Sequence, residues 1–220
     1  MPASERWSWG PRRLGIASSI GILVVGIFYL AVIALWLILE ATPRDPIGDP
    51  YLAVMELLTM VSALALLGLV IAIWCFADAG RRLPALTALA IGCLAVGLTM
   101  TVHFVQLTAI RQLWRAGHLA DYRLVWPSAL FAVEYFAWDI LVGLTLVSAS
   151  FAIAGGPAPQ PARRALLIGG MLCLAGVAGP LSGLMLLQNV AVLGYAVGLP
   201  IAGALTGRMF RATMPHSRAA

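Results

Sequence analysis

Six long apolar runs constrain this chain more than any other feature of its sequence. A helix needs about 20 predominantly apolar residues to cross a bilayer, and each of the six runs is about that long. The composition agrees, because 61% of the 220 residues are hydrophobic and only 10% are charged, whereas soluble domains carry roughly 25% charged residues. The sequence therefore predicts a single all-α transmembrane domain over residues 1–220. The predicted spans are 14–39, 52–77, 83–110, 125–154, 165–187 and 190–209.

The connection between the last two predicted spans is the weakest of the breaks. Only Gln188 and Asn189 separate the two apolar runs. We therefore expect the fifth and sixth helices to form a tight hairpin. One long kinked span is the alternative, and it would leave five crossings.

The distribution of arginine predicts the orientation of the bundle. Ten of the 14 basic residues lie at the two termini and in the second and fourth connections, and four lie in the first and third connections. Positively charged loops stay on the cytoplasmic side, so we expect a multi-pass protein of the cell membrane with both termini in the cytoplasm. Because the charges separate apolar runs instead of forming one patch, they indicate topology and contact with the lipid bilayer, and they do not indicate nucleic-acid binding.

Glycines recur at small-xxx-small spacing near the end of the chain. This spacing lets helices approach closely. The close approach is interpreted either as packing within the bundle or as the interface of a homo-oligomer. The pairs are Gly179 and Gly183, Gly194 and Gly198, and Gly203 and Gly207.

Polar side chains inside the predicted spans are the strongest indication of function. An ionisable side chain at the centre of a span costs about 2.5–3.5 kcal/mol on insertion scales, so such residues tend to be functional. When the alternating helix directions are applied, nearly all of them fall in the outer half of the bilayer, which predicts one shared polar cavity there. They are Glu56, His103, Gln106, Glu134, Asp139 and Asn189.

Helix spacing relates some of these residues to one another. Thr99, His103 and Gln106 follow i, i+4, i+7 and share one helix face. Glu134 and Asp139 are separated by about 140° around a helix axis. These two carboxyl groups can therefore flank one pocket, but they cannot both point straight into it.

Most of the candidates also have a structural interpretation. Glu56 lies near a helix start and can stabilise the helix N-terminus, and His103 can act as a hydrogen-bonding group between helices. Arg111 can extend to the membrane interface or bind an anionic headgroup. For Asp139, in the middle of a span, we favour a functional role.

Several intramembrane chemistries lack the residues that they need. A zinc site requires several His or Cys ligands, but His103 is the only histidine within a predicted span, and Cys75, Cys93 and Cys173 form no CxxC pair. No P-loop or dinucleotide-binding pattern is present. The sequence therefore predicts neither a metal nor another cofactor. Acid–base chemistry by carboxyl groups remains, because apolar surroundings favour the neutral carboxylic acid, which can act as a general acid.

Tyr135-Phe-Ala-Trp-Asp139 resembles the Asn-Phe-Ala-Trp-Glu stretch of the small membrane-integral terpene cyclases of meroterpenoid pathways. Those proteins are helical, similar in size, and use membrane-embedded carboxylates to protonate an epoxide or alkene of a prenylated substrate. The resemblance implies that Asp139 is the acid and that Trp138 lines the pocket. It covers this stretch alone, and the chain departs from the family in having six predicted helices instead of seven. The chain also resembles bacterial six-helix membrane proteins of unknown activity.

These observations lead to an expected function. We expect an enzyme that performs an acid-catalysed transformation, such as cyclisation, of a lipophilic isoprenoid-like molecule. A proton-coupled small transporter or ligand-binding membrane protein is an alternative, and a structural subunit of a membrane complex is another. The expected catalytic residues are Asp139, Glu134, Glu56 and His103. The expected substrate-binding residues are Gln106, Trp138, Tyr135, Asn189 and Arg111.

Overall fold

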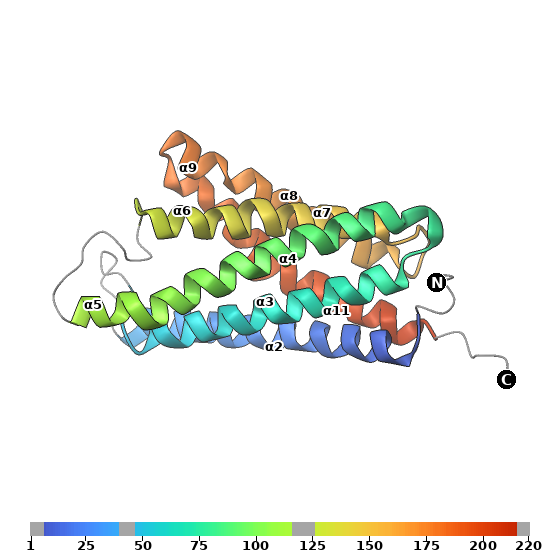
Figure 1. Cartoon of the computed structure of the whole chain (residues 1–220), viewed down its shortest axis with the longest axis horizontal. Coiled ribbons are helices and arrows are strands. Elements are labelled where there is room, and N and C mark those ends of the chain that lie inside the picture. Colours follow the sequence, from blue (N-terminus) through green and yellow to red (C-terminus); the bar gives the residue numbers. More distant parts are fainter. Residues whose placement is uncertain (1–6, 40–46, 116–125, 215–220) are drawn as a thin grey trace.

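The computed structural model describes residues 7–39, 47–115 and 126–214, and every regular element within these ranges is helical. The helices form six spans that are long and apolar enough to cross a membrane, so the predicted number is confirmed. The spans lie side by side in one bundle (Figure 1). Their bounds are Trp9–Leu39, Tyr51–Phe76, Ala79–Leu113, Ala129–Ala152, Gln160–Ser182 and Met185–Ala212.

The first two spans are single helices, and the other four are composite. The single helices are α2 (Trp9–Leu39) and α3 (Tyr51–Phe76). The third and fourth spans are built from η1 (Ala79–Arg81), α4 (Arg82–Val105), η2 (Gln106–Ile110) and α5 (Arg111–Arg115), then α6 (Ala129–Tyr135), η3 (Phe136–Val142) and α7 (Gly143–Ala152). The last two are built from α8 (Gln160–Gly176) and α9 (Ala178–Ser182), then η4 (Met185–Gln188), α10 (Asn189–Val192), η5 (Leu193–Gly198) and α11 (Leu199–Ala212).

The outside of the bundle carries many large apolar side chains. Phe28, Leu94 and Ile168 are 58%, 63% and 59% exposed and belong to three different spans. A water-soluble protein rarely exposes apolar side chains over large contiguous areas, but hydrocarbon solvates them well. The helices also satisfy their own backbone hydrogen bonds, as a bilayer requires.

The start of α2 and the end of α11 lie at the same end of the bundle. The Trp7 ring lies 5.0 Å from Phe76 and 5.1 Å from Phe210, centroid to centroid. The Arg12 guanidinium donates hydrogen bonds to the backbone oxygens of Phe210 and Arg211, at 2.9 and 2.8 Å. We call Trp7, Phe76 and Phe210 the terminal aromatic cluster. The first helix thus begins where the last one ends, as an even number of crossings requires.

The turn between the fifth and sixth spans lies at Gly183 and Leu184, so its predicted position at Gln188 and Asn189 is wrong. Gly183 has a φ of +76° and ends α9 in the left-handed conformation, which glycine adopts readily at helix ends. The Leu184 N–H donates a hydrogen bond to the Ser182 hydroxyl at 3.3 Å. The hairpin itself is present, and the alternative of five crossings is wrong.

Glycines let the last two spans pack closely against their neighbours. A Cβ atom on Gly194 would lie 2.7 Å from the backbone nitrogen of Cys173 and 2.8 Å from the carbonyl oxygen of Gly169. A Cβ atom on Gly207 would lie 2.8 Å from the Cβ atom of Ser19. These small-residue positions therefore serve packing within the chain.

Gly194→Ala is expected to destabilise the protein by about 1–3 kcal/mol, the usual effect of overpacking, because its methyl group meets backbone atoms of α8. Gly97→Ala is the matched control, since a Cβ atom on Gly97 meets nothing within 4 Å. We expect this control to stabilise α4 by about 0.5–1 kcal/mol. Thermal unfolding of both variants in the same detergent measures the difference, and equal melting temperatures would contradict the close packing.

Candidate functional site

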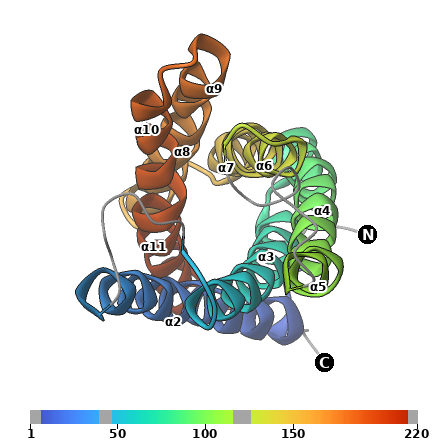
Figure 2. The same cartoon turned by 90° about the vertical axis from the view of Figure 1, so that its left-hand side faces the viewer.

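A cavity of about 540 Å³ lies inside the bundle. The first half of α3 lines it, whereas Phe76 of the terminal aromatic cluster is the last residue of that helix, so the cavity lies toward the opposite end. Figure 2 views the bundle from this end. Side chains from five of the six spans line the cavity, and the fifth span contributes none. Small-molecule sites in proteins typically measure about 300–1,000 Å³, so the cavity is large enough for a ligand.

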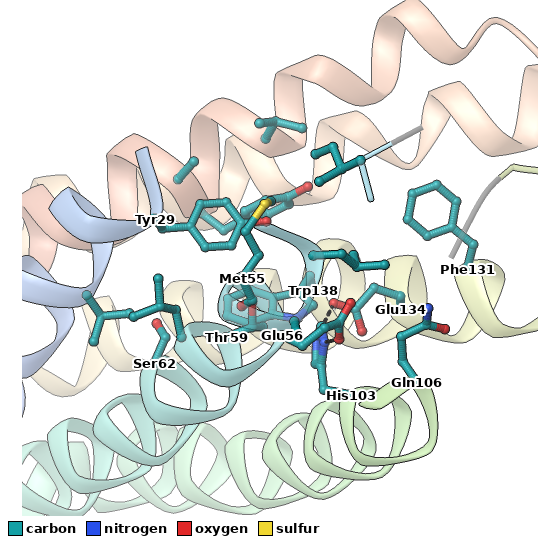
Figure 3. Close-up of a pocket in the computed structure, with 18 of the residues that line it drawn as sticks. Tyr29, Met55, Glu56, Thr59, Ser62, His103, Gln106, Phe131, Glu134 and Trp138 are labelled. Carbon is teal, nitrogen blue, oxygen red and sulfur yellow. Dashed lines mark hydrogen bonds and ion pairs between the residues drawn. The ribbon is translucent and has the colours of Figure 1, made fainter. Parts of the chain in front are cut away.

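A buried cluster of two glutamates and one histidine forms one wall of the cavity (Figure 3). The His103 ring from α4 bonds a carboxyl group on each side. Its Nδ1 atom contacts Glu56 Oε2 of α3, and its Nε2 atom lies 2.8 Å from Glu134 Oε1 of α6. His103 and Glu56 are only 4% and 3% exposed. We call these three residues the Glu–His–Glu cluster.

The geometry of the Glu–His–Glu cluster requires a proton beyond the one that a neutral imidazole carries. Neutral imidazole has a single N–H, and an ionised carboxylate only accepts hydrogen bonds. Both ring nitrogens can bond carboxyl oxygens only when the ring is an imidazolium or when one carboxyl group is protonated. The cluster therefore holds an exchangeable proton next to the cavity.

Three spans depart from α-helical geometry beside the cavity. The segments η2, η3 and η5 are π-helical, and they carry the cavity-lining residues Gln106, Trp138 and Tyr195 respectively. A π-helical turn is rare and frequently occurs at a functional site. Its presence in three spans at the same cavity marks this region as the candidate site.

Asp139 is fully buried and does not belong to the cavity lining. Neither of its carboxyl oxygens has a hydrogen-bond partner among the described residues. The side chain of Gln188 is its polar neighbour, and Gln188 does line the cavity and donates a hydrogen bond to the Tyr195 hydroxyl at 3.3 Å. Glu134 thus faces the cavity, whereas Asp139 lies behind it.

The rim of the cavity carries an ion pair and an aromatic wall. Arg111 Nε donates to Asp49 Oδ2 at 2.7 Å, and both residues line the cavity. The Tyr135 ring lies 4.5 Å from Phe131 and 5.7 Å from Trp126, centroid to centroid. Arg111 is therefore paired with a carboxylate and does not project alone toward a headgroup.

The structure brings together seven of the nine predicted site residues. Asn189 is exposed at the start of α10 and does not line the cavity, because the turn precedes it and its helix carries it outward. The preceding residue, Gln188, lines the cavity instead. Tyr29 and Tyr195 also line the cavity, and nothing in the spacing of the sequence singled them out. The seven are Glu56, His103, Glu134, Gln106, Trp138, Tyr135 and Arg111.

Within the described ranges, no group of three or more His, Cys, Asp or Glu side chains has the arrangement of a metal site. Comparison of the chain with protein-family models, curated proteins and solved structures gives no significant match. The resemblance of residues 135–139 to the terpene cyclases therefore stays a prediction. The functional assignment rests on the geometry of the cavity.

Proposed function

We propose that this chain is a multi-pass enzyme of the cell membrane and that it performs acid–base chemistry on a lipophilic molecule. The arginine distribution supports an orientation with both termini in the cytoplasm. With this orientation, the cavity lies in the outer half of the bilayer. The observation that carries the proposal is the Glu–His–Glu cluster, in which both nitrogens of a buried His103 ring bond carboxyl oxygens at a cavity wall.

The cluster can both give and take a proton. Glu134 Oε2 is buried, lacks a hydrogen-bond partner among the described residues and belongs to a cavity-lining side chain. We assign Glu134 as the group that exchanges a proton with the substrate, His103 as its relay and Glu56 as the group that orients the ring. A positioned acid or base of this kind contributes about 10²–10⁴-fold to a rate.

Isomerisation and cyclisation are the reaction types that this cluster performs without a co-reactant. In such a reaction one substrate atom gains a proton and another atom of the same molecule loses one. The cluster then ends with as many protons as it had at the start. The rings of Trp126, Phe131, Tyr135 and Trp138 line the cavity, and aromatic faces stabilise a positive charge that develops on a substrate.

The arrangement of the polar groups favours an enzyme over the two other classes. A structural subunit would use intramembrane polar residues to bond a partner, but here the Glu–His–Glu cluster lines a cavity within the chain. A transporter needs a path to both sides of the membrane, and the lining of the cavity does not reach the terminal aromatic cluster at the other end of the bundle. Flux of a proton-coupled substrate through proteoliposomes would support the transporter instead.

Deuterium incorporation tests the proposal before the substrate is known. The full-length protein is reconstituted with a mixed bacterial lipid extract in D₂O, and every lipid is analysed by chromatography and mass spectrometry. We expect one lipid to be converted to an isomer that carries solvent deuterium. Glu134→Gln should lower the rate of conversion by about 10²–10⁴-fold.

The control for this experiment is Asp78→Asn. Asp78 is an exposed acidic residue that precedes η1 and lies outside the cavity lining, so its variant should convert the lipid at the wild-type rate. An equal rate in Glu134→Gln and the wild type would refute the assigned role. Absence of solvent deuterium from every lipid would refute the proposed reaction class.

A further inference from the structure

The cavity contains three buried polar atoms that have no partner among the described residues. They are the acceptors Gln106 Oε1 and Glu134 Oε2 and the donor Trp138 Nε1. Their side chains come from three segments, η2, α6 and η3. Glu134 belongs to the Glu–His–Glu cluster, and Gln106 and Trp138 lie beside it (Figure 3). Buried polar atoms are nearly always hydrogen-bonded in folded proteins. A set of both acceptors and a donor in one cavity therefore marks the place of a ligand's polar group.

The charges around these atoms restrict what that polar group can be. Glu56, Glu134 and Asp49 line the cavity, and each described positive group there already contacts a carboxyl oxygen. His103 contacts Glu56 and Glu134, and Arg111 contacts Asp49. At the three unpartnered atoms, a phosphate or carboxylate group would lie next to Glu134, and His103 there is already shared between two carboxyl groups. Like charges in partly buried sites repel strongly. The polar group of the ligand is therefore not an anion.

The rest of the cavity is suited to an apolar chain. Ile22 and Val25 of α2 and Leu199 of α11 line the side contributed by these two helices. Ile22 and Leu199 are each only 1% exposed. A ligand that fills the cavity thus has a small polar end at the Glu–His–Glu cluster and an apolar body along α2 and α11.

We propose that the cavity selects a neutral lipid alcohol. A hydroxyl group has one donor and two acceptor positions, so it offers a partner to either kind of unpartnered atom, to an acceptor such as Gln106 Oε1 or to a donor such as Trp138 Nε1. Glu134 Oε2 then stays free to exchange a proton with the reacting atom of the same molecule. An ammonium group would have no acceptor for Trp138. This inference rests on the proposed function, because it names the substrate class of the same cavity.

Three probes with one tail and different polar groups test this inference. Farnesol, farnesylamine and farnesyl phosphate are titrated into the full-length protein in detergent, and native mass spectrometry measures the fraction bound. We expect one farnesol per chain, bound at least tenfold more tightly than either of the other probes. Trp138→Phe and Gln106→Leu should each weaken the binding of farnesol at least fivefold. Trp9→Phe, at an exposed position at the start of α2 and outside the cavity lining, should leave the affinity unchanged.

Each outcome of the titration bears on the inference. Equal binding of the three probes, preference for the phosphate or the amine, or binding of none of them would overturn it. Full affinity for farnesol in both Trp138→Phe and Gln106→Leu would also overturn it. If one of these variants does not fold, the other still provides the test. Binding of farnesol through Gln106 and Trp138 without incorporation of deuterium into any lipid would overturn the proposed enzyme but leave the alcohol assignment. Conversion of another lipid without binding of farnesol would overturn the alcohol assignment but leave the proposed enzyme.

Discussion

His103→Leu is expected to abolish the incorporation of deuterium and to destabilise the protein by about 3–5 kcal/mol. The substitution removes the ring that joins Glu56 and Glu134, so two buried carboxyl groups lose their shared partner. Removing one member of a buried ionic cluster leaves uncompensated buried groups, which is the origin of a loss of this size. Thermal or denaturant unfolding in detergent measures the stability, and mass spectrometry in D₂O measures the chemistry.

A triple variant separates the catalytic effect from the structural one. Glu56→Gln, His103→Leu and Glu134→Gln together remove every ionisable group of the Glu–His–Glu cluster. We expect this variant to regain most of the stability that His103→Leu loses, because neutral groups of similar shape replace a buried charged network. It should remain inactive. A triple variant no more stable than His103→Leu would show that the loss does not come from the two carboxyl groups, and activity in either variant would refute the proposed role of His103.

The membrane spans could be predicted because a single physical requirement determines them. Each crossing needs a long apolar run, and the runs were visible without knowledge of any contact. The shared cavity could also be predicted in part, because alternating helix directions place four polar residues at a similar depth in the membrane. They are Glu56, His103, Gln106 and Glu134. These four residues do line one cavity. What the sequence did not show was that His103 bonds both glutamates, since such contacts depend on how three separate spans pack.

The errors have local conformational causes. Asp139 is expected from the sequence to be the catalytic acid at the pocket, but it does not line the cavity. Glu134 does line it, and on a regular helix the two side chains point about 140° apart. The polarity of Gln188 and Asn189 predicts a break there, whereas the left-handed conformation of Gly183 ends the preceding helix earlier. A turn set by one glycine within an apolar stretch has no signal in hydropathy.

Asp139→Leu is expected to stabilise the folded protein and to lower the rate of lipid conversion. Leu and Asp have the same number and arrangement of side-chain heavy atoms, so the change replaces two buried oxygens that lack partners among the described residues by two methyl groups. Burying unpaired polar atoms costs about 1–3 kcal/mol in proteins, and we expect a gain of that order. Because Gln188 is the polar neighbour of Asp139 and lines the cavity, the substitution should also displace the Gln188 amide and lower the rate of lipid conversion by about 10–100-fold.

Thr145→Val is the matched control for this last prediction. Thr145 is also fully buried in the fourth span, but its hydroxyl donates a hydrogen bond to the Leu141 carbonyl oxygen at 2.7 Å. Its isosteric replacement should therefore lower stability by about 0.5–1.5 kcal/mol and leave the conversion rate unchanged. Asp139→Asn, which keeps a polar group beside Gln188, should recover most of the rate that Asp139→Leu loses. A stabilised Asp139→Leu variant with full activity would mean that Asp139 does not position the cavity wall, and a strongly destabilised one would mean that its carboxyl group has a bonding partner in the folded protein.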